Sequence, residues 1–283
     1  MNVPSTREKL YGTESEWLET GRFELNTRSL SNFAIRTAKT TFDLDQPNQL
    51  VVFVGGIPKD RQRCEVLPLI NRFHGLLALK VADEGMVGLV YNQPGTGGST
   101  GNLETDTMAD KIELLRDLTM DLLLENDLNE VSFVGMSAGS YVAARASELL
   151  AKQKVKVNSL ILQSPALYPA HVEGIAYGNE FRATLSEHWS HKDSPVFNDL
   201  DSHLGRGGRV HITYFQRDDP PIPIDIQETY MNWVMSREHG DASITSITGV
   251  EHNFRKIGHD SGRNVVDNNA IRKVARELVT IIV

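Results

Sequence analysis

The sequence lacks the features that would tie the protein to a membrane, a nucleic acid or an oxidising compartment. Its 283 residues include one cysteine, Cys64, so no intramolecular disulfide can form. No apolar run reaches the ~18 residues of a transmembrane helix, and residues 1–9 lack the apolar core of a signal peptide. The formal charge is -8 and no basic cluster stands out, which disfavours nucleic acid and anionic membranes as partners. These absences predict a cytoplasmic protein without a membrane span.

The sequence has an ordinary globular composition, 40% hydrophobic and 23% charged, and strand and helix patterns alternate along it. This alternation predicts an α/β fold in one domain over residues 1–283, with a mostly parallel twisted sheet and helices on both faces. An N-terminal arm over residues 1–20 and an antiparallel edge hairpin with strands at 23–26 and 33–44 are expected before it. The pattern predicts strands at 50–54, 86–91, 131–134, 157–162, 210–215 and 243–248, and helices at 64–82, 107–125, 138–152, 224–237 and 268–282.

The alternation stops after Pro165. Residues 167–208 are polar and aromatic without clear periodicity, and we interpret them as a short cap or lid insertion. Its aromatic side chains are expected to shape a pocket, namely those of Tyr168, Tyr177, Phe181 and Trp189.

The most informative stretch is Gly135-Met136-Ser137-Ala138-Gly139, a Gly-x-Ser-x-Gly motif between a predicted strand and a predicted helix. A tight turn there lifts the serine out of the sheet, and larger side chains at either glycine would collide with the neighbouring strand or helix. The context matters, because the motif alone also fits a plain turn with a solvated serine. With both flanks present, Ser137 is the candidate nucleophile.

A serine nucleophile needs a base within hydrogen-bond reach, and the base needs an orienting group. In a parallel sheet these groups should lie in loops at the carboxyl ends of strands. The strand at 210–215 is followed by Asp218 and Asp219, and the strand at 243–248 is followed by His252. Asp219 precedes Pro220, which biases it to an extended backbone. The order along the chain is therefore Ser, Asp, His.

These motifs together resemble the α/β-hydrolase family over roughly residues 30–283. The elbow at 135–139 matches the family's nucleophile motif. Asp219-Pro220-Pro221-Ile222-Pro223 resembles its Asp-x-x-Val-Pro, and Gly249-Val250-Glu251-His252-Asn253-Phe254 resembles its Gly-x-x-His-x-Phe. Gly95-Thr96-Gly97-Gly98-Ser99 resembles its Gly-x-Gly-x-Ser loop. The chain departs from the family where His-Gly is often found, since Gly55-Gly56 stands there, and where Asn92 replaces an aspartate.

The resemblance implies a role for each candidate residue. Ser137 would attack, His252 would move the proton, and Asp219, favoured over Asp218 by the motif spacing, would orient the imidazole. The oxyanion hole would use backbone N–H groups of Ala138 and of Ile57 or Gly56. No cofactor and no metal is needed. The implied substrate is a small-molecule ester or thioester, with a lean towards a small or medium acyl group.

Two other function classes stay open at this point. An acyltransferase would form the same acyl-enzyme and pass it to an alcohol or amine, and a slow-turnover ligand-binding protein could keep the triad. A serine at the elbow argues against the dehalogenases and epoxide hydrolases of the same scaffold, which use an aspartate.

Other sites are weaker. Gly95 to Gly101 follows a strand, as in dinucleotide-binding loops, but the helix is expected only from about Thr107. His188 and His191 with Asp193 could ligate a metal, although a solvated insertion explains them better. His259 follows no strand, and His211 is expected to be structural.

Overall fold

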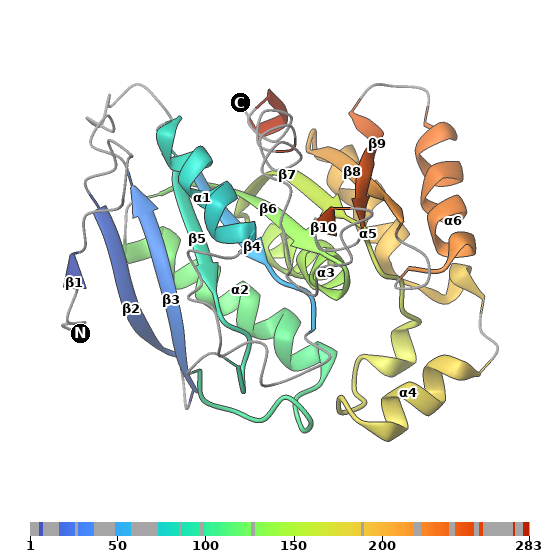
Figure 1. Ribbon diagram of the computed structural model, residues 1–283, viewed down its shortest axis with the longest axis horizontal. Helices are drawn as coiled ribbons and strands as arrows, with labels where there is room; N and C mark the ends of the chain where they lie inside the picture. Colours follow the sequence, from blue (N-terminus) through green and yellow to red (C-terminus); the bar gives the residue numbers. More distant parts are fainter. Residues whose placement is uncertain are drawn as a thin grey trace.

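The computed structural model describes residues 6–7, 17–25, 28–36, 49–57, 73–84, 86–96, 99–125, 128–187, 190–217, 222–237, 241–251, 255–256, 274 and 280–282. The described strands form one ten-stranded sheet in the order β1-β2-β3-β5-β4-β6-β7-β8-β9-β10 (Figure 1). Strands β5, β4, β6, β7, β8 and β9 pair in parallel, as the sequence predicts. Their bounds are Gln49–Val54 for β4, Val87–Tyr91 for β5, Glu130–Met136 for β6, Lys156–Gln163 for β7, Arg209–Arg217 for β8 and Ala242–Glu251 for β9.

The edges of the sheet are antiparallel. On one side lie β1 (Thr6–Arg7), β2 (Trp17–Leu25) and β3 (Arg28–Arg36), and on the other lies β10 (Arg255–Lys256), which pairs with β9. The predicted edge hairpin is confirmed, but its strands begin earlier than expected. Residues 17–20 belong to β2 instead of an arm, because pairing with β3 supplies backbone hydrogen bonds that a polar sequence pattern does not reveal.

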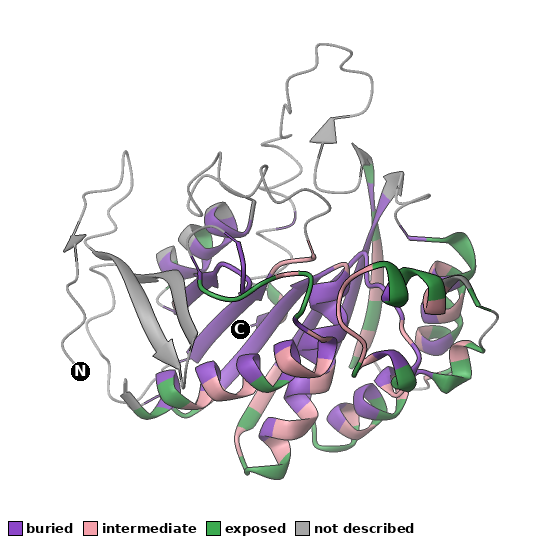
Figure 2. Cartoon of the chain, turned by 90° about the horizontal axis from the view of Figure 1, so that it is seen from below, coloured by how far each residue is buried: buried purple, intermediate pink, exposed green. Residues whose placement is uncertain are grey.

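Helices cover both faces of the sheet. One layer contains α2, α3 and α5, with α3 in contact with both neighbours, and α1 packs over β3, β4 and β5 on the other face (Figures 1 and 2). The central strands are buried between these layers, and every residue of β4 is buried. The helices run over Phe73–Asp83 (α1), Met108–Glu125 (α2), Ala138–Lys152 (α3), Asn179–Ser186 (α4), Val196–Gly205 (α5) and Ile224–Met235 (α6).

The segment expected to be irregular, residues 167–208, contains regular structure. Two 3-10 turns, η3 (Ala170–Val172) and η4 (His191–Asp193), accompany α4 and α5. Helix α5 packs against α3 and β8 and so extends the layer that covers the sheet. Its buried side is Val196, Asp199, Leu200 and His203. Two polar members of that set hide the helical apolar pattern in the sequence.

Two predicted elements lie partly outside the described residues. Residues 64–72 of the predicted helix at 64–82 are not described, and of the predicted helix at 268–282 only residues 274 and 280–282 are, each helical. A membrane-crossing helix is not found among the described residues, where each helix is too short or too polar.

Candidate active site

Ser137 occupies the turn between β6, which ends at Met136, and α3, which begins at Ala138. Its backbone has φ 53 and ψ -124, a conformation that non-glycine residues rarely adopt. Such strain persists only where the surrounding structure fixes it, and it concentrates at functional sites. The turn therefore has the geometry expected of a nucleophile elbow.

Close backbone packing explains both glycines of the motif. A Cβ on Gly139 would lie 2.2 Å from the carbonyl oxygen of Val54 in β4. A Cβ on Gly135 would lie 2.6 Å from the Gly139 carbonyl oxygen and 2.6 Å from the Cα of Ser140. Backbone atoms cannot swing aside as a flexible side chain can, so the collision predicted from the sequence is confirmed.

Hydrogen bonds hold the elbow from several directions. The Ser137 N–H donates to the Gln163 carbonyl oxygen at 2.9 Å, and the Ser137 carbonyl accepts from the N–H groups of Ser140 at 3.0 Å and Ala166 at 3.2 Å. The Ser140 hydroxyl donates to the Gly135 carbonyl oxygen at 2.8 Å. The strained serine is thus tied to its own helix and to the end of β7.

The loop after β4 lies directly against the candidate nucleophile. A Cβ on Gly56 would be 3.7 Å from Ser137 Oγ and 3.2 Å from Ser137 Cβ. Ala138 is the first residue of α3, and the first N–H groups of a helix have no partner within it. The predicted oxyanion donors, Gly56 or Ile57 and Ala138, therefore come from segments that meet at Ser137. Their roles stay predictions.

A glutamine that the sequence reading missed braces this loop. Gln93, buried after β5, donates through Nε2 to the carbonyl oxygen of Gly55 at 3.1 Å. This contact stands where the chain departs from the usual His-Gly and aspartate pattern. The signal in the sequence was Asn92-Gln93 directly after a buried strand, at the edge where loops form the site.

The glycine-rich loop after β5 folds on itself. The Gly95 N–H donates to the Thr100 carbonyl, and the Ser99 hydroxyl donates to the Asn92 carbonyl at 3.0 Å. Helix α2 begins only at Met108, and its Ala109 N–H bonds the Glu173 carbonyl. A dinucleotide-binding loop would run straight into a helix N-terminus, so this loop lacks the required geometry.

Asp218, Asp219 and His252 lie outside the described residues, and the predicted triad therefore stays a prediction. The strands that lead to them are described. β8 and β9 run parallel to β6 and pair side by side, with Arg217 opposite Glu251 in register. Both strands end at the edge of the sheet at which β6 delivers Ser137.

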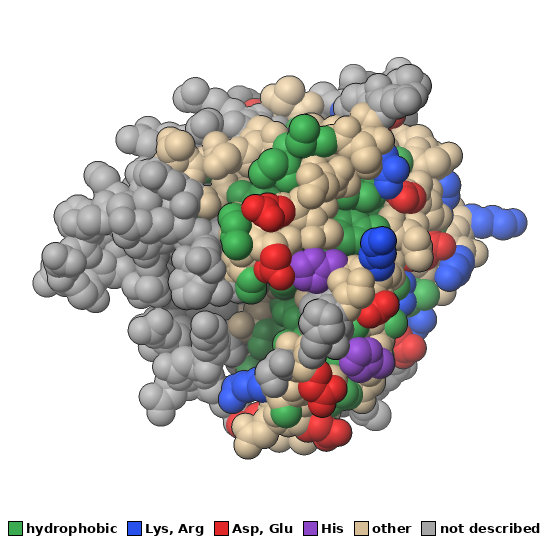
Figure 3. All heavy atoms as spheres, turned by 90° about the vertical axis from the view of Figure 1, so that its right-hand side faces the viewer, with side chains coloured by type: hydrophobic (Ala, Val, Ile, Leu, Met, Phe, Trp, Pro, Cys, Tyr) green, Lys and Arg blue, Asp and Glu red, His purple; other side chains and the backbone are tan. Residues whose placement is uncertain are grey.

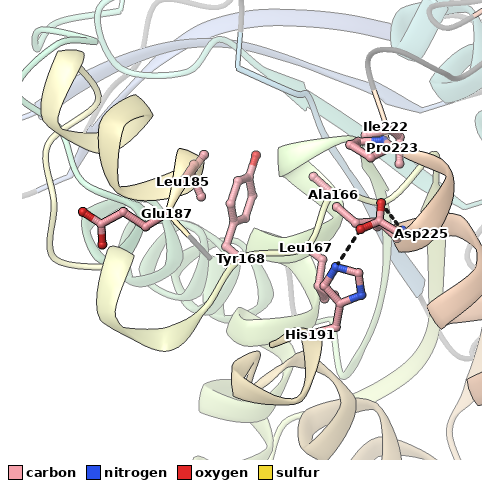
Figure 4. A pocket seen from close by; sticks show the side chains of 10 residues that line it. Ala166, Leu167, Tyr168, Leu185, Glu187, His191, Ile222, Pro223 and Asp225 are labelled. Carbon is pink, nitrogen blue, oxygen red and sulfur yellow. Dashed lines mark hydrogen bonds and ion pairs between the residues drawn. The ribbon is translucent and has the colours of Figure 1, made fainter. Parts of the chain in front are cut away.

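A cavity of about 420 Å³ opens beside the elbow (Figure 4). Its walls come from the loop after β7, the end of α4, η4 and the start of α6, through Ala166, Leu167, Tyr168, Leu185, Glu187, His191, Ile222, Pro223, Asp225 and Ile226. The peptide group of Ala166 links the cavity to the elbow. Its N–H bonds the Ser137 carbonyl, and its carbonyl accepts from the Tyr230 hydroxyl at 3.3 Å.

Aromatic rings support the wall that carries Tyr168. Its ring lies edge-on to Tyr141 at a centroid distance of 5.2 Å and tilted against Phe181 at 5.7 Å, and Tyr177 stacks on Phe181 at 4.4 Å. Burial raises the pKa of Tyr168 to about 12, so its hydroxyl stays protonated near neutral pH. Of the aromatics expected to shape a pocket, Tyr168 lines it and Phe181 and Tyr177 pack behind it. Trp189 lies outside the described residues.

An ion-pair network joins the nucleophile helix to the segment after β7. Arg145 of α3 bonds Glu173 at 2.7 Å and Asp199 of α5 at 2.6 Å, and the Tyr141 hydroxyl donates to Glu173 at 2.7 Å. Burial raises the pKa of Asp199 to about 6, although the Arg145 guanidinium opposes the shift. Sequence reasoning missed this network, because its members are far apart in the chain.

His191 and Asp193, considered as metal ligands, have other partners. His191 contacts the Thr229 hydroxyl through Nδ1 at 2.7 Å and Asp225 through Nε2 at 3.3 Å. Asp193 caps the short turn that begins after Ser190. His188 is not described, and no group of three or more His, Cys, Asp or Glu that could hold a metal occurs within the described residues. His211, expected to be structural, contacts Ser243 and Thr245 on β9.

Parallel strands β5 to β9, helices on both faces and a strained serine after β6 define the α/β-hydrolase fold, and this chain has it. Solved structures agree. Est1E from Butyrivibrio proteoclasticus with ferulic acid bound aligns at a TM-score of 0.63 and 13% identity, over 92% of this chain and 98% of that chain. XC6422 from Xanthomonas campestris, described as an α/β serine hydrolase without lid, aligns at 0.57 and 16% identity, over 96% and 95%.

A serine hydrolase homologue from Coxiella burnetii aligns at a TM-score of 0.56 and 15% identity, over 94% of this chain and 97% of that chain. No protein-family model and no curated protein matches the sequence. At these identities the likeness concerns the fold.

Proposed function

We propose that this protein is a serine hydrolase that cleaves a carboxylic ester or thioester through an acyl-serine intermediate. The observation that carries the proposal is Ser137, held at positive φ on the elbow, with Gly56 against its hydroxyl and a cavity that begins at Ala166. A plain turn needs neither the strain nor the adjoining cavity. Structures described as serine hydrolases are among those that share the fold.

In the proposed mechanism, Ser137 Oγ attacks the carbonyl carbon of the substrate while His252 takes the hydroxyl proton. Asp219 holds the imidazole and stabilises the imidazolium. The N–H groups of Ala138 and of Gly56 or Ile57 stabilise the oxyanion, and each such donor is worth about 3 to 4 kcal/mol. His252 then protonates the departing alcohol or thiol. Water, activated by His252, attacks the acyl-serine, and the acid leaves.

The test combines labelling and turnover. A fluorophosphonate should label the wild-type protein at Ser137 and leave folded Ser137→Ala unlabelled. Hydrolysis of nitrophenyl esters should fall by about 10⁴-fold or more in Ser137→Ala and in His252→Ala, as when catalytic serines and histidines are removed elsewhere. Circular dichroism would establish that the variants are folded. A wild-type protein that binds small molecules but is neither labelled nor active would favour the ligand-binding alternative.

Two further comparisons separate the remaining alternatives. Asp219→Asn should cost up to about 10⁴-fold in turnover, and Asp218→Asn should cost little; the reverse result would assign the acid to Asp218. Adding an alcohol or amine acceptor should leave the free acid as the main product. A dominant transfer product would identify an acyltransferase instead.

A further inference from the structure

The cavity beside the elbow has two kinds of lining. Six of its residues present hydrocarbon, and they come from three different segments: Ala166, Leu167, Leu185, Ile222, Pro223 and Ile226. Ligand sites are typically about 300 to 1,000 Å³ and mostly apolar with few polar groups. A volume of about 420 Å³ lies near the lower end of that range. The cavity therefore suits the hydrocarbon part of a small substrate.

The charged side chains of the cavity are of one sign. Glu187 and Asp225 lie on opposite sides of it (Figure 4), and its ten lining residues include neither lysine nor arginine. His191 is the remaining titratable side chain apart from Tyr168, and its Nε2 faces Asp225 at 3.3 Å. On this side of the molecule a hollow with hydrophobic walls opens among acidic and hydrophobic side chains (Figure 3).

We propose that this cavity receives an apolar substrate group that is uncharged or cationic, and that it discriminates against a group that ends in a carboxylate. The proposal rests on the serine-hydrolase function, because it assigns the cavity to the group next to the scissile carbonyl. An anionic end would lose hydration and meet two carboxylates without a lysine or arginine to pair with. A cationic end would meet the same carboxylates with favourable sign, and clefts of one sign concentrate ligands of the other.

The size of the effect follows from exposure. The Asp225 side chain is 65% exposed, so water and salt screen it. Exposed charge pairs are worth up to about 1 kcal/mol, or about fivefold, so two carboxylates should produce a gap of about tenfold between matched neutral and anionic substrates. The gap should narrow in high salt, which a purely steric preference would not do.

The experiment uses three nitrophenyl esters whose acyl chains share one methylene spacer and end in tert-butyl, trimethylammonium or carboxylate. The first two ends have the same shape and differ in charge. For wild-type protein, kcat/KM should be about tenfold lower for the carboxylate ester than for the tert-butyl ester, and the trimethylammonium ester should be cleaved at least as well as the tert-butyl ester. Glu187→Gln and Asp225→Asn should each narrow the gap by about two- to fivefold.

Glu228→Gln is the matched control, because Glu228 lies exposed on α6 and does not line the cavity. It should leave the ratio of the three rates unchanged. A carboxylate ester that is cleaved as well as the tert-butyl ester, in a reaction lost in Ser137→Ala, would overturn the charge preference and leave the hydrolase function standing. If none of the esters is cleaved, calorimetry with the matching nitroanilides still decides: equal or tighter binding of the carboxylate form overturns the proposal, and weaker binding supports it.

Discussion

Gly56→Ala gives a sharp test of where the loop after β4 lies. The added methyl group would approach the Met136 carbonyl oxygen and Ser137 Cβ at 3.2 Å each, and Ser137 Oγ at 3.7 Å. Contacts of 3.2 Å force a neighbour to move by a few tenths of an ångström. Ser137 has little freedom to move, because its backbone bonds Gln163, Ser140 and Ala166. The strain should therefore displace the loop or the serine side chain.

The expected loss can be scaled from known sensitivities. A misplacement of ~1 Å costs about 10²-fold in rate, so a shift of a few tenths should lower kcat by about tenfold. KM should change by less than about twofold, because the cavity beside Ala166 is untouched and uniform binding is retained. Crowding a packed site costs about 1 to 3 kcal/mol of stability, and we expect the lower end, so the variant should still fold.

Gly55→Ala is the matched control. A Cβ on Gly55 would have no heavy atom within 4 Å, although the residue is adjacent in the chain. Its turnover should equal that of the wild type, and its free energy of unfolding should differ by at most about 0.5 kcal/mol. The assay is steady-state ester hydrolysis, normalised to the fraction of sites that fluorophosphonate titrates, with urea unfolding alongside. Full activity in Gly56→Ala, or an equal loss in both variants, would refute the placement of this loop against the nucleophile.

Two further predictions concern buried polar groups. Burial lowers the pKa of His203 and His211 to about 4. Each neutral ring therefore contributes stability that is complete well above the unfolded pKa of about 6.5 and is reduced by about 2 kcal/mol at pH 5. Urea unfolding at pH 7 and at pH 5 measures this, and equal free energies would contradict it. Gln93→Leu removes the donor to the Gly55 carbonyl; because one hydrogen bond is worth about 1 kcal/mol, kcat should fall about fivefold with the fold intact, whereas an unchanged kcat would show that the loop holds its place without Gln93.

The parallel sheet was predictable because its strands are buried on both faces. Continuous apolar runs such as Leu50–Val54 mark that environment, and β4 lies in the middle of the sheet with every residue buried. The elbow was predictable for a similar reason. A glycine pair around a serine at a strand end has few other uses, and the steric need for both glycines is visible in the contacts of Gly135 and Gly139.

The features that escaped prediction depend on partners distant in the chain. Arg145 reads as an ordinary surface residue of an amphipathic helix, yet it pairs with Glu173 and Asp199. Helix α5 escaped because Asp199 and His203 occupy its buried face. Gln93 escaped because its amide donates to Gly55, which lies 38 positions earlier. Periodicity reports burial by apolar residues, and it carries no information on polar groups that are buried with a partner.

The candidate site depends on backbone proximity more than on side-chain identity. Gly139 lets α3 approach the Val54 carbonyl, and Gly56 lets the loop after β4 approach Ser137 from the other side. Both contacts involve β4, so this one strand positions the elbow and the loop expected to complete the oxyanion hole. Because backbone donors need no particular side chain, the change from His-Gly to Gly55-Gly56 can preserve the loop's function while the bracing contact passes to Gln93. On this reasoning, substitutions that crowd β4 and its loop should impair turnover before they unfold the protein.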